Sequence, residues 1–478
     1  MSRARLFSIV SLLSGLVLVL AGLSGTSAVA AVSGFLSQTF DAGSRDAAIQ
    51  TNTSAMMDRG RDTFRNDTFG SEKFFTGTIQ LNQAIQTVSP MTALGVGLKV
   101  DLPSLEQNDP NLVNAIVNAL QTNNAAPFQD PQITLQLIKD NAVVGVRGTV
   151  AGSPGHLTLT SMGITCGLCH STVQDAGLAF ANGTPVSGIG TPLDGVPNRD
   201  LNVGTIISLA PNLQPVADLL NSAGPIHNQP FPITVSSLRS VLQQWGPGKF
   251  DAEVFMDGKV INPATGKPAP TLIPPAYGMA GVNMHTFTGW GSVTYWNAFV
   301  ANLEMHGSPG TFFDPRLDDK EKFPIAAVNH FGHVSSPPDQ DRITRKLAAL
   351  QFYQLSLPTP PSPFTLDAGA VQRGRALFDG SARCATCHVP PLYTEPGWNM
   401  HKPKDIGIDD FQAERSPDER YRTTPLGGLG SRAQQQGGFF HDGRYATLLD
   451  VVNHYNGFLK LGLTDAQKQD LVTFLESL

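Results

Sequence analysis

The sequence predicts a mainly α-helical fold made of two fused units of the same type, with long ordered loops. Two short patterns each occur twice in the 478 residues: an Arg-Gly-Arg-x-x-Phe segment (59–64 and 373–378) and a cysteine pair followed by a histidine. Glycine (47) and proline (35) are frequent, whereas charged residues make up only 15%, against about 25% in a typical domain. This composition excludes a coiled coil or a helical repeat array. The net charge of −6 and the lack of a basic tract argue against a nucleic-acid partner.

Residues 1–30 have the layout of a secretory signal peptide. Arg3 and Arg5 precede an uncharged run from Leu6 to Leu23, and small residues follow up to Ala30. An uncleaved membrane anchor is the alternative, because an apolar run of about 18 residues can span a bilayer. We expect cleavage, and therefore an exported protein, periplasmic or extracellular, with no membrane span in the mature chain.

All four cysteines lie in two copies of the pattern Cys-x-x-Cys-His, at 166–170 and 384–388. This is the attachment pattern of c-type haem, in which two thiols bond to the porphyrin and the histidine binds the iron. A Cys-x-x-Cys redox pair and a zinc half-site are the alternatives, but neither needs a histidine directly after the pair, twice. The pattern predicts two covalently bound c-type haems, attached through Cys166, Cys169, Cys384 and Cys387, with His170 and His388 as iron ligands.

Each unit opens with a glycine-containing helix and closes with an apolar one. The opening helices contain the Arg-Gly-Arg segments, and the closing helices are expected at 347–353 and 470–475. A capping box of Thr464 and Gln467 starts the last helix. A small residue in the opening helix lets the two backbones cross closely, which is how a cytochrome c fold clasps its haem. The sequence thus predicts two cytochrome c-type haem domains.

A proline-rich stretch at 358–363 marks the boundary between these domains, because four prolines in six residues form a stiff, extended linker. The first domain is expected to cover 41–357 and the second 364–478. The first domain contains an insertion at 65–165 that separates its opening helix from its cysteines.

This insertion is expected to contain both helical and extended structure. Residues 110–122 have a helical pattern, with Asp109 as the N-cap and Pro110 at the first helical position. Apolar residues alternate around Asn141 between residues 133 and 150, which predicts a β hairpin or two strands.

The second domain resembles the C-terminal half of bacterial di-haem cytochrome c peroxidases and of the di-haem enzyme that matures methylamine dehydrogenase. The resemblance is carried by residues 373–378, 384–388, 421–426, 440–448 and 451–455.

The first domain is similar to these proteins only through its haem motif, Trp245-Gly246-Pro247 and residues 271–276. It departs from them at Thr288–Ser292, where the peroxidases have a Trp-Asp-Gly-Arg-like turn followed by an acidic residue that serves the open haem. The nearest downstream acid in this chain is Glu304. In layout the first domain is also similar to rubber-cleaving di-haem oxygenases.

The resemblance implies an exported di-haem c-type cytochrome oxidoreductase of the peroxidase kind. A six-coordinate haem would pass electrons to a second haem that reacts with a small oxidant such as hydrogen peroxide. The electron donor would be a small redox protein or another donor. The alternatives are a pure electron-transfer cytochrome and an oxygenase that acts on an apolar substrate. The three differ in whether the first iron keeps an open distal site.

Several other residues are candidates for the haem sites. By resemblance, Trp245 lies between the haems, and the alternative is a packed core aromatic. His285, Met305 and His306 are candidates for the distal side of the first iron. His441, in the His-Asp-Gly turn, is expected to bond within the turn or to a haem propionate.

Tyr455 is the expected distal ligand of the second iron. A helix start at Thr447 predicts a helix from Leu448 to Asn456, with Tyr455 on its apolar face and His454 turned about 100° away. By resemblance, the maturation enzyme has a tyrosine at this spacing, whereas ordinary peroxidases have methionine. The alternatives are that Tyr455 only packs, with His454 or no residue at the iron.

The resembling peroxidases also contain a calcium ion between their domains. Asp194, Asn198 and Asp200 form an oxygen-rich loop that is a candidate for this ion, and a solvated turn is the alternative.

Overall fold

The computed structural model describes residues 42–307 and 309–478, so the expected signal peptide lies outside the described residues. The described residues divide into two units between Asp58 and Arg59. Helix α3 (Ala42–Asn66) runs across this division, and the fold below is that of the larger unit, from Arg59 onward. The predicted boundary at 358–363 falls inside this unit, so the division into two haem domains stays a prediction.

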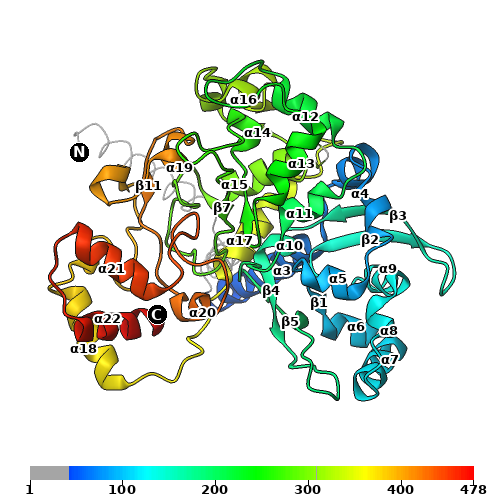
Figure 1. Ribbon diagram of the computed structural model, residues 1–478, viewed down its shortest axis with the longest axis horizontal. Helices are drawn as coiled ribbons and strands as arrows, with labels where there is room; N and C mark the ends of the chain where they lie inside the picture. Colours follow the sequence, from blue (N-terminus) through cyan, green and yellow to red (C-terminus); the bar gives the residue numbers. More distant parts are fainter. Residues whose placement is uncertain (1–41, 308) are drawn as a thin grey trace, which may run out of the picture. The chain divides into compact units, whose positions relative to one another are not determined.

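The larger unit is mostly helical with small sheets (Figure 1), in agreement with the predicted mainly α class. Residues 59–357, called here the N-terminal part, contain most of the short helices. These are η1 (Lys73–Thr78), α4 (Leu81–Ile85), α5 (Pro90–Gly95), α6 (Leu102–Asn108), α7 (Pro110–Gln121), α8 (Ala126–Gln129), α9 (Pro131–Lys139), α10 (Gly167–His170), α11 (Val203–Ser208), α12 (Gln214–Asn221), α13 (Val235–Gln243), α14 (Val254–Asp257), α15 (Val293–Phe299), η2 (Val300–Glu304), η3 (Pro315–Asp318), α16 (Pro324–Val328), η4 (Thr344–Lys346) and α17 (Leu347–Ser356).

The strands of the N-terminal part form small sheets. They are β1 (Val100–Asp101), β2 (Val146–Ala151), β3 (Thr158–Ile164), β4 (Ser171–Asp175), β5 (Ile189–Asp194), β6 (Lys249–Phe250), β7 (Thr271–Leu272), β8 (Phe312–Phe313) and β9 (His333–Val334). The largest sheet has the order β1-β5-β4, with β1 parallel and β4 antiparallel to β5. In the remaining sheets two strands pair antiparallel: β2 with β3, β6 with β7, and β8 with β9.

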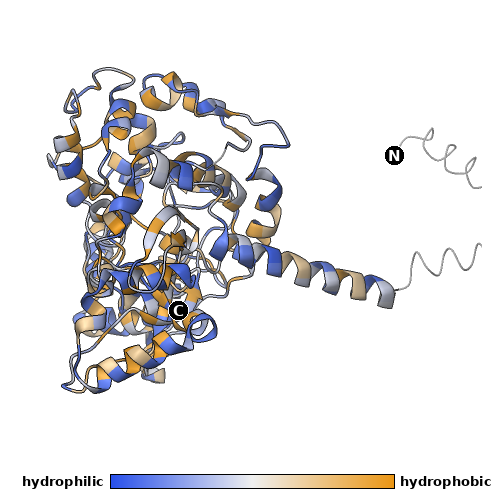
Figure 2. Cartoon of the chain, turned by 90° about the vertical axis from the view of Figure 1, so that its right-hand side faces the viewer, coloured by the Kyte–Doolittle hydropathy of each residue, from blue (hydrophilic) through white to orange (hydrophobic). Residues whose placement is uncertain are grey.

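Residues 364–478, called here the C-terminal part, contain longer helices. The elements are α18 (Ala368–Asp379), η5 (Cys384–Thr386), β10 (Met400–His401), η6 (Pro403–Asp405), α19 (Phe411–Glu414), β11 (Tyr421–Arg422), α20 (Leu429–Ala433), α21 (Leu448–Phe458) and α22 (Asp465–Glu476). Figure 2 shows hydrophilic and hydrophobic residues interspersed along the helices of the chain. Among the described residues, no helix has the length and hydropathy needed to cross a bilayer.

The insertion differs from its prediction in one place. Helix α7 begins at Pro110 as expected, and the Asp109 carboxylate accepts a hydrogen bond from the Leu112 amide at 2.9 Å. The expected strand at 133–139 is wrong, because this stretch lies in α9. Asp130 caps α9 and Pro131 fits its first turn. The hairpin exists but lies further along the chain, formed by β2 and β3.

The opening and closing helices cross at glycine in both parts, as predicted. A Cβ atom added at Gly374 of α18 would collide with the backbone oxygen of Asp470 in α22. A Cβ atom added at Gly60 of α3 would collide in the same way with the backbone oxygen of Ala349 in α17. Only a residue without a side chain permits these approaches. Figure 1 shows α18 and α22 side by side.

A buried ion triad joins the two parts of the larger unit. Arg415 of the C-terminal part is fully buried and donates to Asp257 at 2.7 Å and to Asp251 at 2.8 Å. Beside it, Gln412 donates to Glu253 at 2.5 Å. A buried arginine is tolerated because the two carboxylates balance its charge.

The glycine crossing leads to a testable prediction. Gly374→Ala should lower the free energy of unfolding by about 1–3 kcal/mol, the usual range for overpacking. The matched control is Gly457→Ala in α21, where an added Cβ has no atom within 4 Å. The control should be neutral or stabilising by about 0.5–1 kcal/mol, since alanine favours helix. Denaturant unfolding followed by circular dichroism measures both, and equal effects of the two variants would contradict the close crossing.

Candidate functional site

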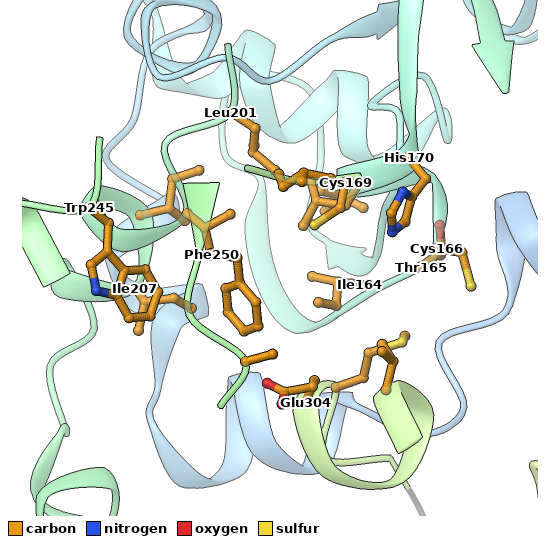
Figure 3. A pocket seen from close by; sticks show the side chains of 18 of the residues that line it. Ile164, Thr165, Cys166, Cys169, His170, Leu201, Ile207, Trp245, Phe250 and Glu304 are labelled. Atoms are coloured by element: carbon orange, nitrogen blue, oxygen red, sulfur yellow. The ribbon is translucent and has the colours of Figure 1, made fainter. Parts of the chain in front are cut away.

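The first cysteine motif lies on the wall of a cavity of about 350 Å³ that is lined mainly by the N-terminal part, with Gln412 and Arg422 from the C-terminal part. Cys166, Cys169 and His170 line it together with mostly apolar side chains (Figure 3). Backbone hydrogen bonds fix the motif. The Asn198 amide donates to the Cys169 carbonyl at 2.9 Å, and the Gly195 amide donates to the His170 carbonyl at 2.7 Å.

The donor set of this motif fits a haem. His170 Nδ1 is shielded from solvent and has no hydrogen-bond partner among the described residues. Burial lowers the pKa of His170 to about 4, although the Pro274 carbonyl opposes this shift. The imidazole is therefore neutral at physiological pH, the form that binds a metal.

The thiols argue against the redox-pair alternative. Burial is the main reason why the pKa values of Cys166 and Cys169 are raised to about 12. A reactive redox cysteine needs a lowered pKa, because the thiolate is the nucleophile. None of the four cysteines forms a disulfide.

In the second motif, by contrast, the histidine Nδ1 has a hydrogen-bond partner. His388 Nδ1 lies 3.0 Å from the Tyr393 carbonyl, which only accepts hydrogen bonds, so Nδ1 must carry the proton. The other ring nitrogen, Nε2, then presents a lone pair, which is the arrangement common to metal-binding histidines. Burial lowers the pKa of His388 and raises that of Cys384 to about 11.

A carboxylate and an imidazole lie near the second motif. Potential ligand atoms of Cys387, Glu395 and His401 all lie within 4.8 Å of one another. Glu395 already accepts hydrogen bonds from His401 at 2.6 Å and from Asn399 and Thr423. Glu395 and His401 thus form a satisfied pair rather than an open zinc half-site.

Tyr455 and His454 both lie near the second motif. The predicted helix is confirmed: α21 starts with a capping box of Thr447 and Asp450. Burial raises the pKa of Tyr455, and the thiols of Cys384 and Cys387 raise it further. His454 has a protein partner of its own, because its Nδ1 lies 2.8 Å from the Tyr445 hydroxyl. Its Nε2 is shielded from solvent and has no hydrogen-bond partner in the described part.

Trp245 lies on the side of the cavity away from His170 (Figure 3). It is 4% exposed and packs edge-on against Phe250, with ring centroids 5.5 Å apart. Its position between two haems stays a prediction.

The three candidates for the distal side of the first iron also line the cavity. His285 Nε2 pairs with the Val282 carbonyl at 3.1 Å. The His306 ring stacks on Phe74 with centroids 3.9 Å apart, and Met305 is buried. Burial lowers the pKa values of both histidines to about 4.

Glu304, at the end of η2, is a further functional candidate. The sequence indicates it only as the first acidic residue after Thr288–Ser292. It lies across the cavity from His170 (Figure 3). Both carboxylate oxygens are shielded from solvent and have no partner among the residues described. Burial raises the pKa of Glu304 well above its usual value, and the neighbouring Glu253 and Asp251 raise it further. Burial and the neighbouring carboxyl groups therefore favour the protonated form of Glu304.

Asp314 anchors the segment that leads to Glu304. Its carboxylate accepts hydrogen bonds from the Tyr295 hydroxyl at 2.7 Å and from Arg316 Nε at 2.9 Å. Tyr295 belongs to α15, which continues directly into η2. Burial alone would raise the pKa of Asp314, but the hydrogen bonds from Arg316 and Tyr295 outweigh it and lower the pKa.

The loop considered for calcium does not fit that ion. Asp194 accepts hydrogen bonds from Arg65, Ser171 and Tyr353. Asp200 accepts from Lys99 and Gln436. The Asn198 amide group donates to the Gly97 carbonyl at 2.8 Å. The oxygens are therefore used by different protein donors instead of converging on one point.

The side-chain partners of His441 lie outside its turn, and its Nδ1 is buried without a hydrogen-bond partner among the described residues, so the contact with a haem propionate stays a prediction. Its Nε2 lies 2.8 Å from Asp409, and its ring stacks on Tyr421. Within the turn, Arg444 pairs with Asp442.

Comparison with curated proteins finds relatives of low identity. Over 243 residues the chain is 26% identical to a cytochrome-c peroxidase from Denitromonas iodatirespirans, covering 39% of this chain and 63% of the relative. Over 246 residues it is 26% identical to the methylamine utilization protein MauG of Methylorubrum extorquens, covering 44% and 65%. The resemblance to di-haem peroxidases and MauG is confirmed, at low identity. The chain spans less than two thirds of the length of either relative. No family model matches it.

Solved structures align with only part of this chain. A MauG-like protein associated with microbial copper homeostasis is 19% identical with a TM-score of 0.29, covering 45% of this chain and 75% of that one. The diheme peroxidase BthA from Burkholderia thailandensis is 18% identical with a TM-score of 0.24, covering 44% and 66%. These TM-scores are too low to support an argument about the fold.

The lowered pKa of Asp314 leads to a pH-dependence prediction. Its folded-state pKa lies below the unfolded value of about 3.9. The charged form therefore stabilises the fold fully above that pH, and the stabilisation is lost as the pH falls through the folded-state pKa. Asp314→Asn should cost about 1–3 kcal/mol at pH 7, and less as the pH approaches about 3.

Denaturant unfolding across this pH range measures the effect. The control is Asp379→Asn, at an exposed carboxylate 3.7 Å from Arg375, and its effect should be smaller at every pH. An Asp314→Asn penalty that stays constant down to low pH would show that packing, not charge, is lost.

Proposed function

We propose that this chain is an exported di-haem c-type cytochrome that acts as a peroxidase-like oxidoreductase. One haem is held by Cys166, Cys169 and His170, and the other by Cys384, Cys387 and His388. The relatives named as a cytochrome-c peroxidase and as MauG support this class of activity. The oxidant is hydrogen peroxide, and the electrons come from a small redox protein or another donor.

The observation that carries the proposal is the Glu304 carboxyl group in the cavity of the first motif. An electron carrier has no need for a buried, unpartnered acid that faces its ligand histidine. Reduction of hydrogen peroxide to water consumes two electrons and two protons, and a bound haem would supply the redox-active iron. Burial favours the protonated form of Glu304, whose carboxyl group can release a proton inside a cavity with a mostly apolar lining.

An oxygenase that acts on an apolar substrate is the second candidate. It is supported by the lining of the cavity, which is dominated by aliphatic and aromatic side chains. A haem also requires an apolar crevice, so this lining supports the oxygenase less specifically than Glu304 supports peroxide reduction.

The proposal predicts that Glu304→Gln slows reoxidation of the reduced protein by hydrogen peroxide about 100-fold or more. Glutamine keeps the shape of the side chain but has no carboxyl proton. Stopped-flow absorbance measures the rate, and a pyridine haemochrome assay should give two covalent haems per chain in both proteins.

The matched control is Glu253→Gln, at a second buried acid that lines the cavity but already accepts from Gln412. A larger loss in this control would assign the proton to Glu253. Equally slow reoxidation of the wild-type protein by peroxide and by oxygen would favour the electron carrier.

We also propose Tyr455 as the distal ligand of the second iron. Tyr455→Phe should then change the low-spin ferric EPR spectrum, because the phenolate oxygen is lost. His454→Ala should leave the spectrum nearly intact. The reverse outcome would identify His454 as the ligand, and an unchanged spectrum in both variants would leave Tyr455 with a packing role only.

A further inference from the structure

Two arginines and a tyrosine between the two parts of the larger unit are buried and lack an ion-pair partner among the described residues, although the Arg432 guanidinium lies over the Phe439 ring at 5.5 Å. Arg199 is 3% exposed, Arg432 9% and Tyr277 6%. Both terminal nitrogens of Arg199, Nε of Arg432 and the Tyr277 hydroxyl are shielded from solvent and form no hydrogen bond within the described residues.

These groups converge on the segment from Gly428 to Gly437. The Tyr277 hydroxyl packs so closely on Gly428 that an added Cβ there would collide with it. Arg432 lies one turn further on, and its amide donates to the Gly428 carbonyl at 3.0 Å. A Cβ added at Gly437 would lie 3.7 Å from Nη1 of Arg199. Side chains from both parts of the unit thus meet at one place.

The cluster has an excess of positive charge. An arginine side chain stays protonated in proteins, so burial does not remove its charge. Burial lowers the pKa of Arg199 to about 9, and Arg432 lowers it further, while Tyr277 acts in the opposite direction. No carboxyl group of the described residues contributes to the shift of either arginine.

Arg415 provides the contrast. It lies between the same two parts and is also buried, but Asp251 and Asp257 balance its charge. A buried cation is retained when an anion pairs with it. Water can satisfy the N–H groups of Arg199 and Arg432, but it cannot balance two like charges. The cluster therefore needs an anion from outside the polypeptide.

We propose that Arg199, Arg432 and Tyr277 bind the propionate carboxylates of the haem held by Cys166 and Cys169. This inference rests on the proposed function. The backbone connects the cluster to that motif, because the amide of Asn198, next to Arg199, donates to the Cys169 carbonyl.

The cavity adds a second connection. Pro275 and Ala276, which precede Tyr277, line the cavity. Guanidinium groups bind carboxylates through paired hydrogen bonds, and the tyrosine hydroxyl provides another donor. A free oxyanion such as sulfate has the same chemistry and is the alternative source of charge.

The test uses the haem-loaded protein and the variant Arg199→Gln. Loss of the guanidinium should shift the propionate bending band in the resonance Raman spectrum. It should also lower the midpoint potential of one haem, because a nearby positive charge stabilises the reduced form, while the other haem is unchanged. Arg199→Lys keeps the charge and should lower the potential less. Tyr277→Phe removes only the hydroxyl and gives a milder variant in case Arg199→Gln does not fold.

The control is Arg375→Gln, at an exposed arginine of α18, which should change neither signal. Unchanged Raman bands and potentials in Arg199→Gln and Tyr277→Phe would overturn the inference while leaving the haem enzyme in place. A wild-type chain without covalent haem in the haemochrome assay would overturn the proposed function and this inference together.

A third measurement separates the two sources of the anion. The wild-type holoprotein is dialysed into a zwitterionic buffer and titrated with sulfate while its thermal midpoint is recorded. A midpoint that does not respond supports the propionates, because the site is already filled. A midpoint that rises and saturates with sulfate identifies a free-anion site and overturns the assignment to haem.

Discussion

The close crossing of an opening and a closing helix at glycine is the constraint on which both motif regions depend. In the N-terminal part, Gly60 lets α3 approach α17, and this brings Arg65 and Tyr353 to the same carboxylate, Asp194. Asp194 also accepts from Ser171, the neighbour of His170. In the C-terminal part the crossing at Gly374 brings Phe378 against Phe474, and the Phe378 ring faces that of His388. Each helix crossing is therefore linked to the histidine of its motif, His170 or His388, through only a few side-chain contacts.

Buried ionisable side chains in the described part of the chain differ in whether they have partners. Those with partners, such as Arg415 and Asp314, hold segments together and account for the shape of the site. Others, including Glu304 and Arg199, have buried polar atoms without a hydrogen-bond partner among the described residues. In the function proposed above, Glu304 would serve the oxidant and Arg199 the haem propionates. A polar group without a partner is costly in a protein interior, so its retention points to a role in binding or reaction. The unpartnered groups are therefore more informative about function than the satisfied ones.

The features predicted from sequence are those fixed by local chemistry. The caps at Asp109, Thr447 and Thr464 are found because each side chain bonds to an amide close to it in the sequence. The error at 133–139 arose because apolar alternation outweighed the helix start at Asp130. Glu304 could not be recognised as a site residue from sequence, since its importance comes from burial by distant segments. The loop from Asp194 to Asp200 looked like a metal site because its hydrogen-bond donors lie far away in the chain.

Arg415 also has a consequence for how this protein can change over evolutionary time. Its guanidinium, in the C-terminal part, is neutralised by two carboxylates from the N-terminal part. In a C-terminal part standing alone, this arginine would be a buried cation without its partners. A substitution at position 251, 257 or 415 therefore leaves a buried charge unbalanced unless the other positions change with it. Each of the two parts is thus constrained by the other through this triad.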